Sequence, residues 1–421
     1  MSVAAASVSE VCEAAKKAAV VLGSAETTAK DAALAATARI LGERTSEILE
    51  ANAGDLADER AAGLTDALRD RLTLSPERVA AMAEGIEVVA ALEDPVGEEL
   101  EQHVLASGLD LRKVRVPLGV VGVVYEARPN VTIDCAALTI KSGNAIVLRG
   151  SSYAERSNGA LAAVVREALA EAGLPEDAVA LLAGGGREEL AELATQDRFV
   201  DLLIPRGGEG LKAALKDVAT VPVIYAAAGN CHIYVHSEAD LDMARRIAFN
   251  AKTQRPGVCN AAETLLVDAA VAEDFLPEIL ADLDQAGVEL VGDEQVRARA
   301  GQVEVGAATE EDWATEYLDL KLAVGVVDSL QSAVEHINRY GTRHSEAIVT
   351  SSSQAATRFT SQVDAAVVYT NASTRFTDGF EFGMGAEIGN STQKLHARGP
   401  IGLRELTTYK YVVRGDGQVR E

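Results

Sequence analysis

A repeated alternation of apolar strand patterns and helical patterns between residues 120 and 230 constrains the fold of this chain more than any other feature. The run VVGVVYEA at 120–127 contains glycine and no polar alternation, which is typical of a strand buried on both faces of a parallel sheet. The segments AIVLRG, AVALLAGG, FVDLLIPRGG and VPVIYAAAGN follow as strand patterns separated by helical patterns. This alternation predicts a doubly wound nucleotide-binding domain with room for a dinucleotide.

A second α/β pattern begins at residue 231. HIYVH is a strand pattern, DLDMARRIAFNAKT is helical, and LKLAVGVVDS, EAIVTSS and DAAVVYTN are further strand patterns. The chain is helical from Ala29 to about Glu99, and the glycine-rich stretch DGFEFGMGAEIGNST predicts little regular structure. We therefore expect one domain of residues 1–104 and 120–230 and a second of residues 231–398.

Two more strand patterns have no obvious partner near them in the sequence. LDLRKVRVPL, from Leu109, alternates apolar and charged residues, and TTYKYVVRG near the C-terminus is rich in β-branched and aromatic residues. Strands without partners favour a sheet that is shared between subunits. Residues 105–119 and 399–421 are therefore predicted to form a small oligomerisation element, and the protein is expected to be a homo-oligomer.

The charge of the chain limits its partners. Its 421 residues include 64 aspartates and glutamates against 39 lysines and arginines, a formal net charge of -25. A field of that sign repels phosphate backbones, so neither nucleic acid nor an anionic membrane is an expected partner. An anionic substrate must then be held by a local group of cations.

The sequence also predicts the compartment. The N-terminal segment MSVAAASVSEVCEAAKKAAVVLGSA has the wrong order of charges for a secretory signal and predicts an amphipathic helix. No run approaches the roughly 18 apolar residues that a membrane-spanning helix needs. The cysteines show neither CxxC nor metal-ligand spacing, which argues against a disulfide framework and a zinc site. We expect a cytoplasmic protein.

The four cysteines lie in different sequence contexts. Cys259 stands in a polar loop, with Lys252 and Arg255 shortly before it, and positive charge in a loop favours the thiolate. Apolar or strand contexts surround the others, which are predicted to be small buried hydrophobic residues: Cys12, Cys135 and Cys231. Cys259 is the candidate nucleophile, although a buried structural role is the alternative for it as well.

Glycine and histidine patterns indicate which phosphate and metal sites the chain can form. Neither GGG at 184–186 nor GEG at 208–210 continues as a P-loop, so ATP binding is not expected. The first predicts a turn, whereas PRGGEG ends an apolar strand and opens a helix, where backbone N–H groups could face a phosphate. His232 and His236 would lie roughly 13 Å apart on a strand, too far for one metal ion, so we expect a metal-free protein.

Five blocks of sequence resemble one family: VPLGVVGVVYEARPNVTIDCAALTIKSGNAIVLRGS, VDLLIPRGG, FNAKTQRPGVCNAAET, YGTRHSEAIVT and FGMGAEIGNST. Their order over nearly the whole chain is similar to that of the gamma-glutamyl phosphate reductases, or glutamate-5-semialdehyde dehydrogenases, of the aldehyde dehydrogenase superfamily. The resemblance implies an aldehyde-dehydrogenase-like α/β fold. Its parts would be a Rossmann-type NADPH-binding domain, an α/β catalytic domain and a small β oligomerisation element, with the boundaries given above.

The resemblance also implies catalytic roles. Cys259 is similar to the superfamily nucleophile, and a thiolate suits attack on an acyl phosphate because the resulting thioester can accept hydride. Asn130 matches the asparagine whose amide stabilises the tetrahedral oxyanion, with a turn residue after proline as the alternative. Where other aldehyde dehydrogenases carry a water-activating glutamate, this chain has the segment 225–230, YAAAGN, without a carboxylate. Such an enzyme would hydrolyse its thioester poorly.

Ligand-binding roles follow in the same way. Arg149 could pair with the 2′-phosphate of NADPH, with Ser151 beside it, although a surface arginine is the alternative. Other cofactor residues implied are Arg206, Gly207 and Gly208 for the pyrophosphate and Glu316 for the nicotinamide ribose. Arg128 and Arg255 are assigned to the acyl phosphate, with salt-bridge partners as the alternative. Arg343 and His344 are assigned to the glutamyl carboxylate.

The activity implied is the NADPH-dependent reduction of L-glutamyl 5-phosphate to L-glutamate 5-semialdehyde and phosphate in L-proline biosynthesis, functionally coupled to glutamate 5-kinase. An aldehyde dehydrogenase for another substrate, with hydrolytic or CoA-dependent deacylation, is the nearest alternative. A catalytically silent nucleotide-binding or scaffold protein is a third. The segment at 225–230 argues against the first alternative, and the presence of Cys259 with Asn130 argues against the second.

Overall fold

The structure is a computed structural model that describes residues 6–182, 185–225 and 228–420. The chain forms two compact units. The first contains Met1–Tyr225, Gly383–Gly389 and Ile401–Glu421, and the second contains Ala226–Phe382 and Asn390–Pro400. The chain leaves the first unit at Tyr225 rather than at residue 230. Near the C-terminus the chain re-enters the first unit twice, at Gly383–Gly389 and at Ile401–Glu421. The second unit is therefore not the continuous segment 231–398 that the sequence predicted.

The N-terminal part of the first unit is helical, as predicted. Helix α1 (Val8–Leu22) starts at a capping box, because Ser7 Oγ accepts from Glu10 N–H at 3.3 Å and Glu10 Oε2 accepts from Ser7 N–H at 2.8 Å. The amphipathic N-terminal helix is thereby confirmed. The helices that follow are α2 (Thr27–Glu43), α3 (Thr45–Leu56), the short η1 (Glu59–Gly63), α4 (Asp66–Leu72) and α5 (Pro76–Ala91).

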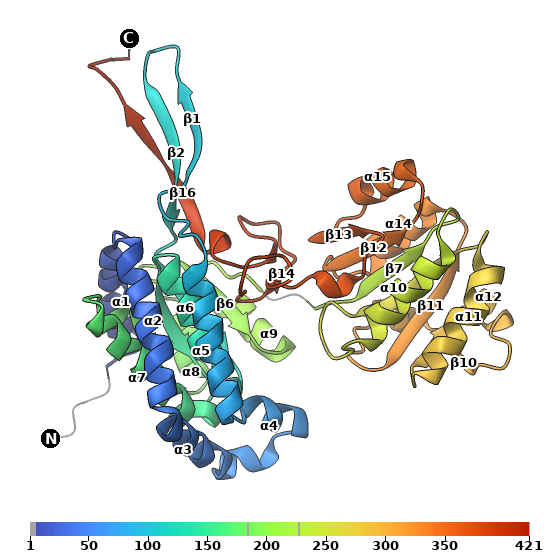
Figure 1. Ribbon diagram of the computed structural model, residues 1–421, viewed down its shortest axis with the longest axis horizontal. Coiled ribbons are helices and arrows are strands. Elements are labelled where there is room, and N and C mark those ends of the chain that lie inside the picture. The colour runs from blue at the N-terminus through green and yellow to red at the C-terminus, as the bar shows by residue number, and fades with distance from the viewer. Residues whose placement is uncertain (1–5, 183–184, 226–227, 421) are drawn as a thin grey trace. The chain divides into compact units, whose positions relative to one another are not determined.

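A parallel sheet forms the centre of the first unit (Figure 1). Its strands are, in spatial order, β5 (Val179–Leu181), β4 (Ala145–Arg149), β3 (Val120–Tyr125) and β6 (Leu202–Arg206). Every residue of β3 is buried, as predicted for a strand covered on both faces. The crossover elements are α6 (Asn130–Lys141), η2 (Ser152–Ala154), α7 (Glu155–Glu171), η3 (Glu176–Ala178), α8 (Arg187–Ala194) and α9 (Glu209–Val218).

One predicted strand of this series is absent from the described part of the sheet. VPVIYAAAGN contributes only an isolated bridge between Val223 and Leu203 of β6. Pro222 has no N–H to extend the ladder, which is a physical reason for the short pairing. Residues 226 and 227 of the predicted strand lie outside the described residues, and over residues 221–225 the predicted strand is reduced to this bridge.

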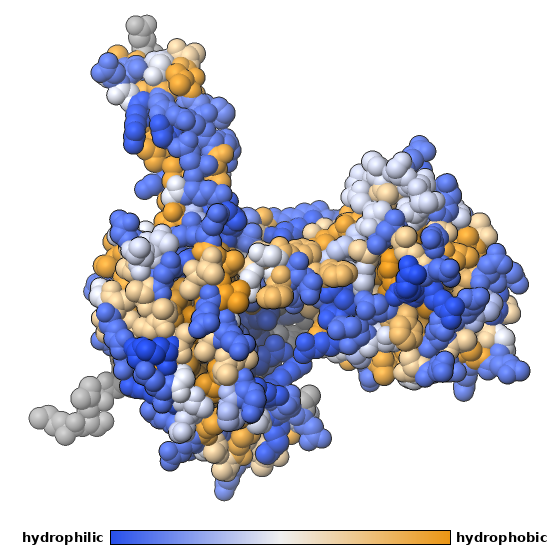
Figure 2. All heavy atoms as spheres, viewed as in Figure 1, coloured by the Kyte–Doolittle hydropathy of each residue, from blue (hydrophilic) through white to orange (hydrophobic). Residues whose placement is uncertain are grey.

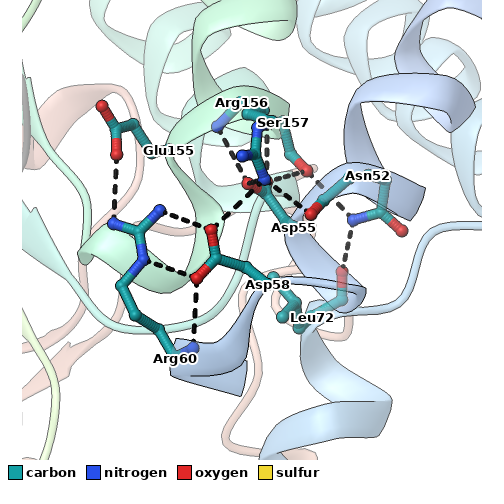
Figure 3. Close-up of polar contacts among 9 residues, drawn as sticks. Asn52, Asp55, Asp58, Arg60, Leu72, Glu155, Arg156 and Ser157 are labelled. Atoms are coloured by element: carbon teal, nitrogen blue, oxygen red, sulfur yellow. Dashed lines mark hydrogen bonds and ion pairs between the residues drawn. The ribbon is translucent and has the colours of Figure 1, made fainter. Parts of the chain in front are cut away.

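The start of α7 is fixed by buried side chains from the helical region (Figure 3). Asp55 accepts from Arg156 N–H at 3.1 Å and from Ser157 N–H at 2.8 Å, so its carboxylate caps the helix from another element. Asn52 donates to Ser157 Oγ at 3.0 Å and to the carbonyl oxygen of Leu72 at 2.8 Å. Because these groups are buried, the network holds the turn that connects β4 to α7.

The two strands that were predicted to lack partners pair with each other. Strand β2 (Asp110–Pro117) is central in an antiparallel sheet between β1 (Glu99–Val104) and β16 (Thr407–Arg414) (Figure 1). Thr407 lies opposite Pro117, and Arg414 lies opposite Asp110. The expectation that these strands need another subunit as their pairing partner was therefore wrong, although both outer strands still have an edge.

The second unit is an α/β domain around a seven-stranded parallel sheet. Its strands are, in spatial order, β10 (Val305–Ala307), β9 (Glu289–Gly292), β11 (Lys321–Val327), β8 (Ala262–Asp268), β7 (Cys231–Val235), β12 (Ser345–Val349) and β13 (Val367–Thr370). The helices are α10 (Leu241–Thr253), α11 (Ala272–Gln285), α12 (Glu294–Ala298), α13 (Glu310–Ala314), α14 (Leu330–Tyr340), α15 (Ser353–Gln362) and the short η4 (Thr374–Phe376). Strands β9 and β10 are short and were not predicted.

Little regular structure follows β13, as the glycine-rich sequence indicates. The two-residue strands β14 (Asn390–Ser391) and β15 (Gly399–Pro400) pair with each other in the second unit, and η5 (Arg404–Leu406) precedes β16 in the first.

Candidate active site

A buried ion pair closes the loop that carries Cys259. The loop lies between α10 and β8, and Lys252 near the end of α10 donates to Glu263 on β8 at 2.5 Å. Both side chains are fully buried. Burial raises the pKa of Glu263 to about 7, with Lys252 opposing this, and burial lowers the pKa of Lys252. Loss of either partner would leave the other charge buried, so the pair is well suited to fix both ends of the loop.

The backbone of Cys259 is held by very close packing. A Cβ at Gly229 would lie 1.5 Å from the Cys259 carbonyl oxygen, so only glycine fits there. The Cys231 thiol donates to the same oxygen at 3.2 Å. Burial raises the pKa of Cys231 well above its ordinary value, which keeps this second thiol protonated.

Three of the four cysteines were predicted to be small buried residues, and the structure confirms this. Cys259 is partly exposed, and the three buried thiols are Cys12, Cys135 and Cys231. Burial raises the pKa of both Cys12 and Cys135 to about 12. Only a partly exposed thiol can meet a substrate, so Cys259 is the candidate nucleophile on accessibility as well as on sequence context.

Glu316 lies next to the same loop. Its Oε1 accepts from Gly229 N–H at 2.6 Å, so one carboxylate oxygen is engaged by the glycine that packs on Cys259. Two residues later, Leu318 has φ of 54°, a left-handed conformation that bulky residues avoid, and its N–H donates to Glu263 Oε1 at 3.1 Å. The Glu316 segment is thus anchored to Gly229, which packs on Cys259, and to Glu263 at the β8 end of the nucleophile loop.

The segment 225–230 was expected to lack a water-activating carboxylate. Residues 226 and 227 lie outside the described residues. The remaining part has no acidic side chain of its own; among the described residues, Glu316 accepts from Gly229 N–H, and the charge of Asp217 acts on Tyr225.

Two arginines bring positive charge to Cys259. Arg255 is exposed and stands just before it in the loop. Arg375, in η4, is partly buried and was not among the sequence candidates. Burial lowers the pKa of Arg375, as does the nearby charge of Arg255, whereas Asp378 and Cys259 act in the opposite direction. The structure therefore adds Arg375 to the candidate site.

The residues predicted for the glutamyl carboxylate have other partners. Arg343 is exposed, adopts φ of 67°, and lies 3.7 Å from Asp364. His344 is fully buried, with Nδ1 2.8 Å from Ser345 Oγ. Burial lowers the pKa of His344 to about 4, so its imidazole is neutral at pH 7. This argues against His344 as a charged partner for a carboxylate.

Asn130 stands at the start of α6 in the first unit, where its side chain is exposed. Its Nδ2 donates to Asp134 Oδ2 at 2.8 Å, which leaves the second amide hydrogen for another acceptor. Burial raises the pKa of Asp134 to about 6, while Asn130 and the charge of Arg206 oppose this. In the preceding turn, Arg128 N–H donates to the carbonyl oxygen of Glu126 at 2.6 Å.

The proposed 2′-phosphate position lies at the end of β4. Arg149 donates to the carbonyl oxygen of Gly185, to that of Gly186 at 3.1 Å, and to Glu189 Oε1 at 3.4 Å. Its guanidinium is therefore tied to the α8 side of the sheet. Ser151 Oγ is buried and has no hydrogen-bond partner among the residues described here, which is the pattern expected of a hydroxyl that meets a ligand.

The glycines after β6 pack closely, as expected for a turn that approaches a ligand or another chain segment. A Cβ at Gly207 would lie 2.8 Å from Glu126 Oε1, and Gly208 N–H donates to that oxygen at 3.3 Å. A carboxylate thus occupies the anion position at the start of α9 in this structure. Arg206 packs against Gly389, whose φ of 151° and lack of a side chain allow the contact.

Sequence reasoning missed several residues that contact the candidate catalytic and cofactor-binding residues within each unit. An acidic residue inside the apolar strand pattern NAAETLLV was a visible signal for Glu263. The sequence offers no local signal for Gly229, Arg375, Asp134 or Glu126, because each matters only through residues from another element.

In the described ranges no three His, Cys, Asp or Glu side chains come together as a metal site. His232 to Val235 lie in strand β7, as predicted for HIYVH, and His236 follows its end. His232 Nδ1 lies 2.9 Å from Glu346 Oε2, and His236 Nδ1 lies 3.0 Å from Thr350 Oγ1. Within the same described part of the chain, no helix has the length and apolar character needed to cross a membrane.

Comparison with known proteins places these features in one class. The model of the aldehyde dehydrogenase family matches residues 1–319. A glyceraldehyde-3-phosphate dehydrogenase from Methanocaldococcus jannaschii, solved with NADP, shares the fold at 18% identity and a TM-score of 0.66, over 97% of this chain and 94% of that chain. These findings define an aldehyde dehydrogenase fold.

Relatives of higher sequence identity show to which group of the aldehyde dehydrogenase family the chain belongs. The gamma-glutamyl phosphate reductase of Thermobifida fusca is 56% identical over 98% of both chains. The crystal structure of the Thermotoga maritima gamma-glutamyl phosphate reductase is 49% identical and superposes with a TM-score of 0.95, over 98% of this chain and 99% of that one. The chain belongs to the gamma-glutamyl phosphate reductases of the aldehyde dehydrogenase family.

Proposed function

We propose that the chain catalyses the NADPH-dependent reduction of L-glutamyl 5-phosphate to L-glutamate 5-semialdehyde and phosphate, a step of L-proline biosynthesis. The observation that carries the proposal is the partly exposed Cys259 on a loop fixed by Lys252, Glu263 and Gly229. The close relationship to proteins of that name supports the choice of substrate.

The chain's own residues account for the steps of the reaction. The Cys259 thiolate attacks the acyl carbon, and the side-chain amide of Asn130 with the Cys259 N–H would stabilise the oxyanion that forms. Removing one such donor typically costs roughly 3 to 4 kcal/mol of transition-state stabilisation. Expulsion of phosphate leaves a thioester on Cys259, which is reactive enough to accept hydride.

NADPH would supply the hydride. The described residues fit such a cofactor at one end, because the buried Ser151 hydroxyl beside the end of β4 lacks a partner. We assign Ser151 and Arg149 to the adenosine ribose and its 2′-phosphate, and Arg206, Gly207 and Gly208 to the pyrophosphate. For the second group, the Glu126 carboxylate would have to leave Gly208 N–H. Glu316 is assigned to the nicotinamide ribose.

A phosphate-dependence assay tests the reaction. We expect L-glutamate 5-semialdehyde and NADP to produce the absorbance of reduced cofactor only when phosphate or arsenate is present, because the thioester needs an oxyanion to release it. Equal rates without either anion would contradict the reductase assignment and favour the hydrolytic alternative. Turnover only with CoA would favour the acyl-transferring alternative.

We also propose a homo-oligomer that is joined through the three-stranded sheet. Tyr409, Tyr411 and Val413 alternate along β16, so they share one face, and each is about half exposed. Hydrophobic side chains are visible on the surface of this sheet (Figure 2). The β2 residues opposite Tyr409 and Tyr411 on this face are Arg115 and Lys113, and Lys113 Nζ lies 4.3 Å from the centroid of the Tyr409 ring. Half-exposed aromatic side chains on an edge strand favour association with a second copy.

Tyr411→Lys should weaken the oligomer, because it removes an exposed aromatic side chain and places a second positive charge directly opposite Lys113. Analytical ultracentrifugation should show a shift toward smaller species at the same protein concentration. Lys410→Gln, on the opposite face of β16, is the matched control and should leave the distribution unchanged. An unaltered distribution for Tyr411→Lys would exclude this face as the interface.

The proposal also covers the setting of the reaction. The structure describes all four cysteines, and none is in a disulfide, which supports a reducing compartment such as the cytoplasm. An acyl phosphate hydrolyses readily, so functional coupling to glutamate 5-kinase would bring the substrate to Cys259 soon after it forms.

A further inference from the structure

The segment around η4 is attached directly to the residue that follows the nucleophile. Asn260 Nδ2 donates to the carbonyl oxygen of Thr377 at 2.9 Å and to that of Arg375 at 3.4 Å, and Thr374 Oγ1 donates to the carbonyl oxygen of Asn260 at 2.7 Å. Asn260 and Thr374 are buried. The backbone that carries Arg375 is therefore built onto the Cys259 loop, 115 positions earlier in the chain.

The side chain of Arg375 is held on one nitrogen only. Its Nε donates to Gln254 Oε1, in the same loop, at 2.9 Å. Among the described residues, none accepts from its two terminal nitrogens, and no carboxylate forms an ion pair with it within 4.0 Å. The partly buried guanidinium is thus oriented by its Nε hydrogen bond. The two terminal nitrogens, the fork with which arginine binds anions, have no hydrogen-bond partner among the described residues.

The charges around Arg375 also indicate that its guanidinium is available to bind an anion. Arg255 adds a second positive charge, and Asp378 is the acidic group that acts on Arg375, without forming an ion pair with it. Asp378 instead accepts from Phe380 N–H at 2.9 Å. Two like charges of which one is partly desolvated are unfavourable unless an anion joins them. Cys259 supplies one negative charge nearby when its thiol is ionised, and an anionic ligand can supply more.

We propose that Arg375, together with Arg255, binds the phosphoryl group of the acyl phosphate substrate beside Cys259. The inference rests on the proposed function. In the forward step the Sγ–C bond forms and the C–O bond to phosphate breaks, so the leaving phosphate takes the electron pair. The Arg375 fork neutralises the charge that grows on its oxygens. In the reverse step the same fork holds inorganic phosphate for attack on the thioester.

A phosphoryl group suits this position better than the substrate's α-carboxylate. The phosphate is bonded to the carbon that Sγ attacks, whereas the α-carboxylate lies at the far end of the glutamyl chain. A cation whose charge acts directly on Cys259 is therefore placed for the group that leaves from that carbon. This assignment differs from the pairing of Arg128 with Arg255, since Arg375 comes from the same unit as the nucleophile.

The test compares Arg375→Gln with Arg375→Lys, and uses Arg358→Gln on the exposed face of α15 as the matched control. Two readouts are measured: the KM for phosphate in the oxidative direction, and the protection of Cys259 by inorganic phosphate against alkylation by iodoacetamide. We expect Arg375→Gln to raise the KM and the protecting concentration by about tenfold or more. The KM for NADP should be unchanged, Arg375→Lys should be intermediate, and Arg358→Gln should match the unmodified protein.

The outcomes separate this inference from the proposed function. Unmodified protein that turns over without phosphate refutes the proposed reaction, while the alkylation assay still reports on the anion site because it needs no turnover. Unchanged phosphate protection in both Arg375 variants overturns the inference. So does a raised KM for the semialdehyde, or protection by L-glutamate, with an unaltered response to phosphate, because these results would assign Arg375 to the carboxylate. If Arg375→Gln does not fold, as judged by circular dichroism, Arg375→Lys alone decides.

Discussion

Replacing Cys259 by serine should reduce turnover by at least about 10³-fold while leaving NADPH binding intact. A serine hydroxyl is a much weaker nucleophile than a thiolate at neutral pH, because it stays protonated unless a base removes its proton. An ester on serine is also a poorer hydride acceptor than a thioester. Turnover is measured by NADPH oxidation with the acyl phosphate, and binding by quenching or enhancement of NADPH fluorescence.

Cys12→Ala is the matched control for this substitution, because Cys12 is a buried thiol on α1 in the first unit. We expect it to retain turnover, with at most a modest loss of thermal stability. Substantial activity in Cys259→Ser would remove the covalent mechanism, whatever the binding result. Loss of activity in both variants would instead indicate a general sensitivity to cysteine replacement.

Gly229→Ala should be nearly as damaging, although residue 229 carries no side chain that could take part in chemistry. The added Cβ would meet the carbonyl oxygen of Cys259 at 1.5 Å and its carbonyl carbon at 2.3 Å. Both are backbone atoms, so the loop itself must move, and a displacement of about 1 Å can cost roughly 100-fold in rate. The hydrogen bond from Gly229 N–H to Glu316 would be disturbed at the same time.

We therefore expect Gly229→Ala to lower kcat by about 100-fold or more, with a loss of roughly 1 to 3 kcal/mol in stability from overpacking. Steady-state kinetics and thermal unfolding measure the two effects. Gly159→Ala is the control, because no atom lies within 4 Å of a Cβ there and alanine favours the helix it occupies. Wild-type kcat in Gly229→Ala would show that this close contact does not position the nucleophile.

Both substitutions act on a loop that is anchored at several points. Lys252 and Glu263 close its ends, Gly229 and Cys231 contact the Cys259 backbone, and Asn260 connects it to η4. A nucleophile held in this way needs no large rearrangement of its own backbone when substrate arrives.

The acidic character of the chain makes the arginines more important. With a net charge of -25, long-range steering opposes the approach of a phosphorylated substrate and of NADPH. Binding must then come from short-range contacts, such as those proposed for Arg255 and Arg375. The surface acidity is best explained by solubility.

Local pattern was sufficient for much of this protein. A strand buried on both faces must be apolar throughout, so β3 and β4 could be placed from sequence alone, as could the helices whose apolar residues recur every three or four positions. The polar loop with nearby cations distinguished Cys259 from three buried cysteines for the same reason: those signals lie within a few residues of the thiol.

Contacts between distant segments could be decided only by the tertiary structure. Strand β16 pairs with β2, and the η4 segment that carries Arg375 is hydrogen-bonded to Asn260 next to Cys259, yet no periodicity in either segment records its partner. The role of Gly229 was likewise not predictable from sequence. Only the packing shows that a side chain at this position would collide with the backbone of Cys259. The periodicity of side chains predicts which face of a helix or strand is buried. Which segment covers that face depends on how the whole chain folds.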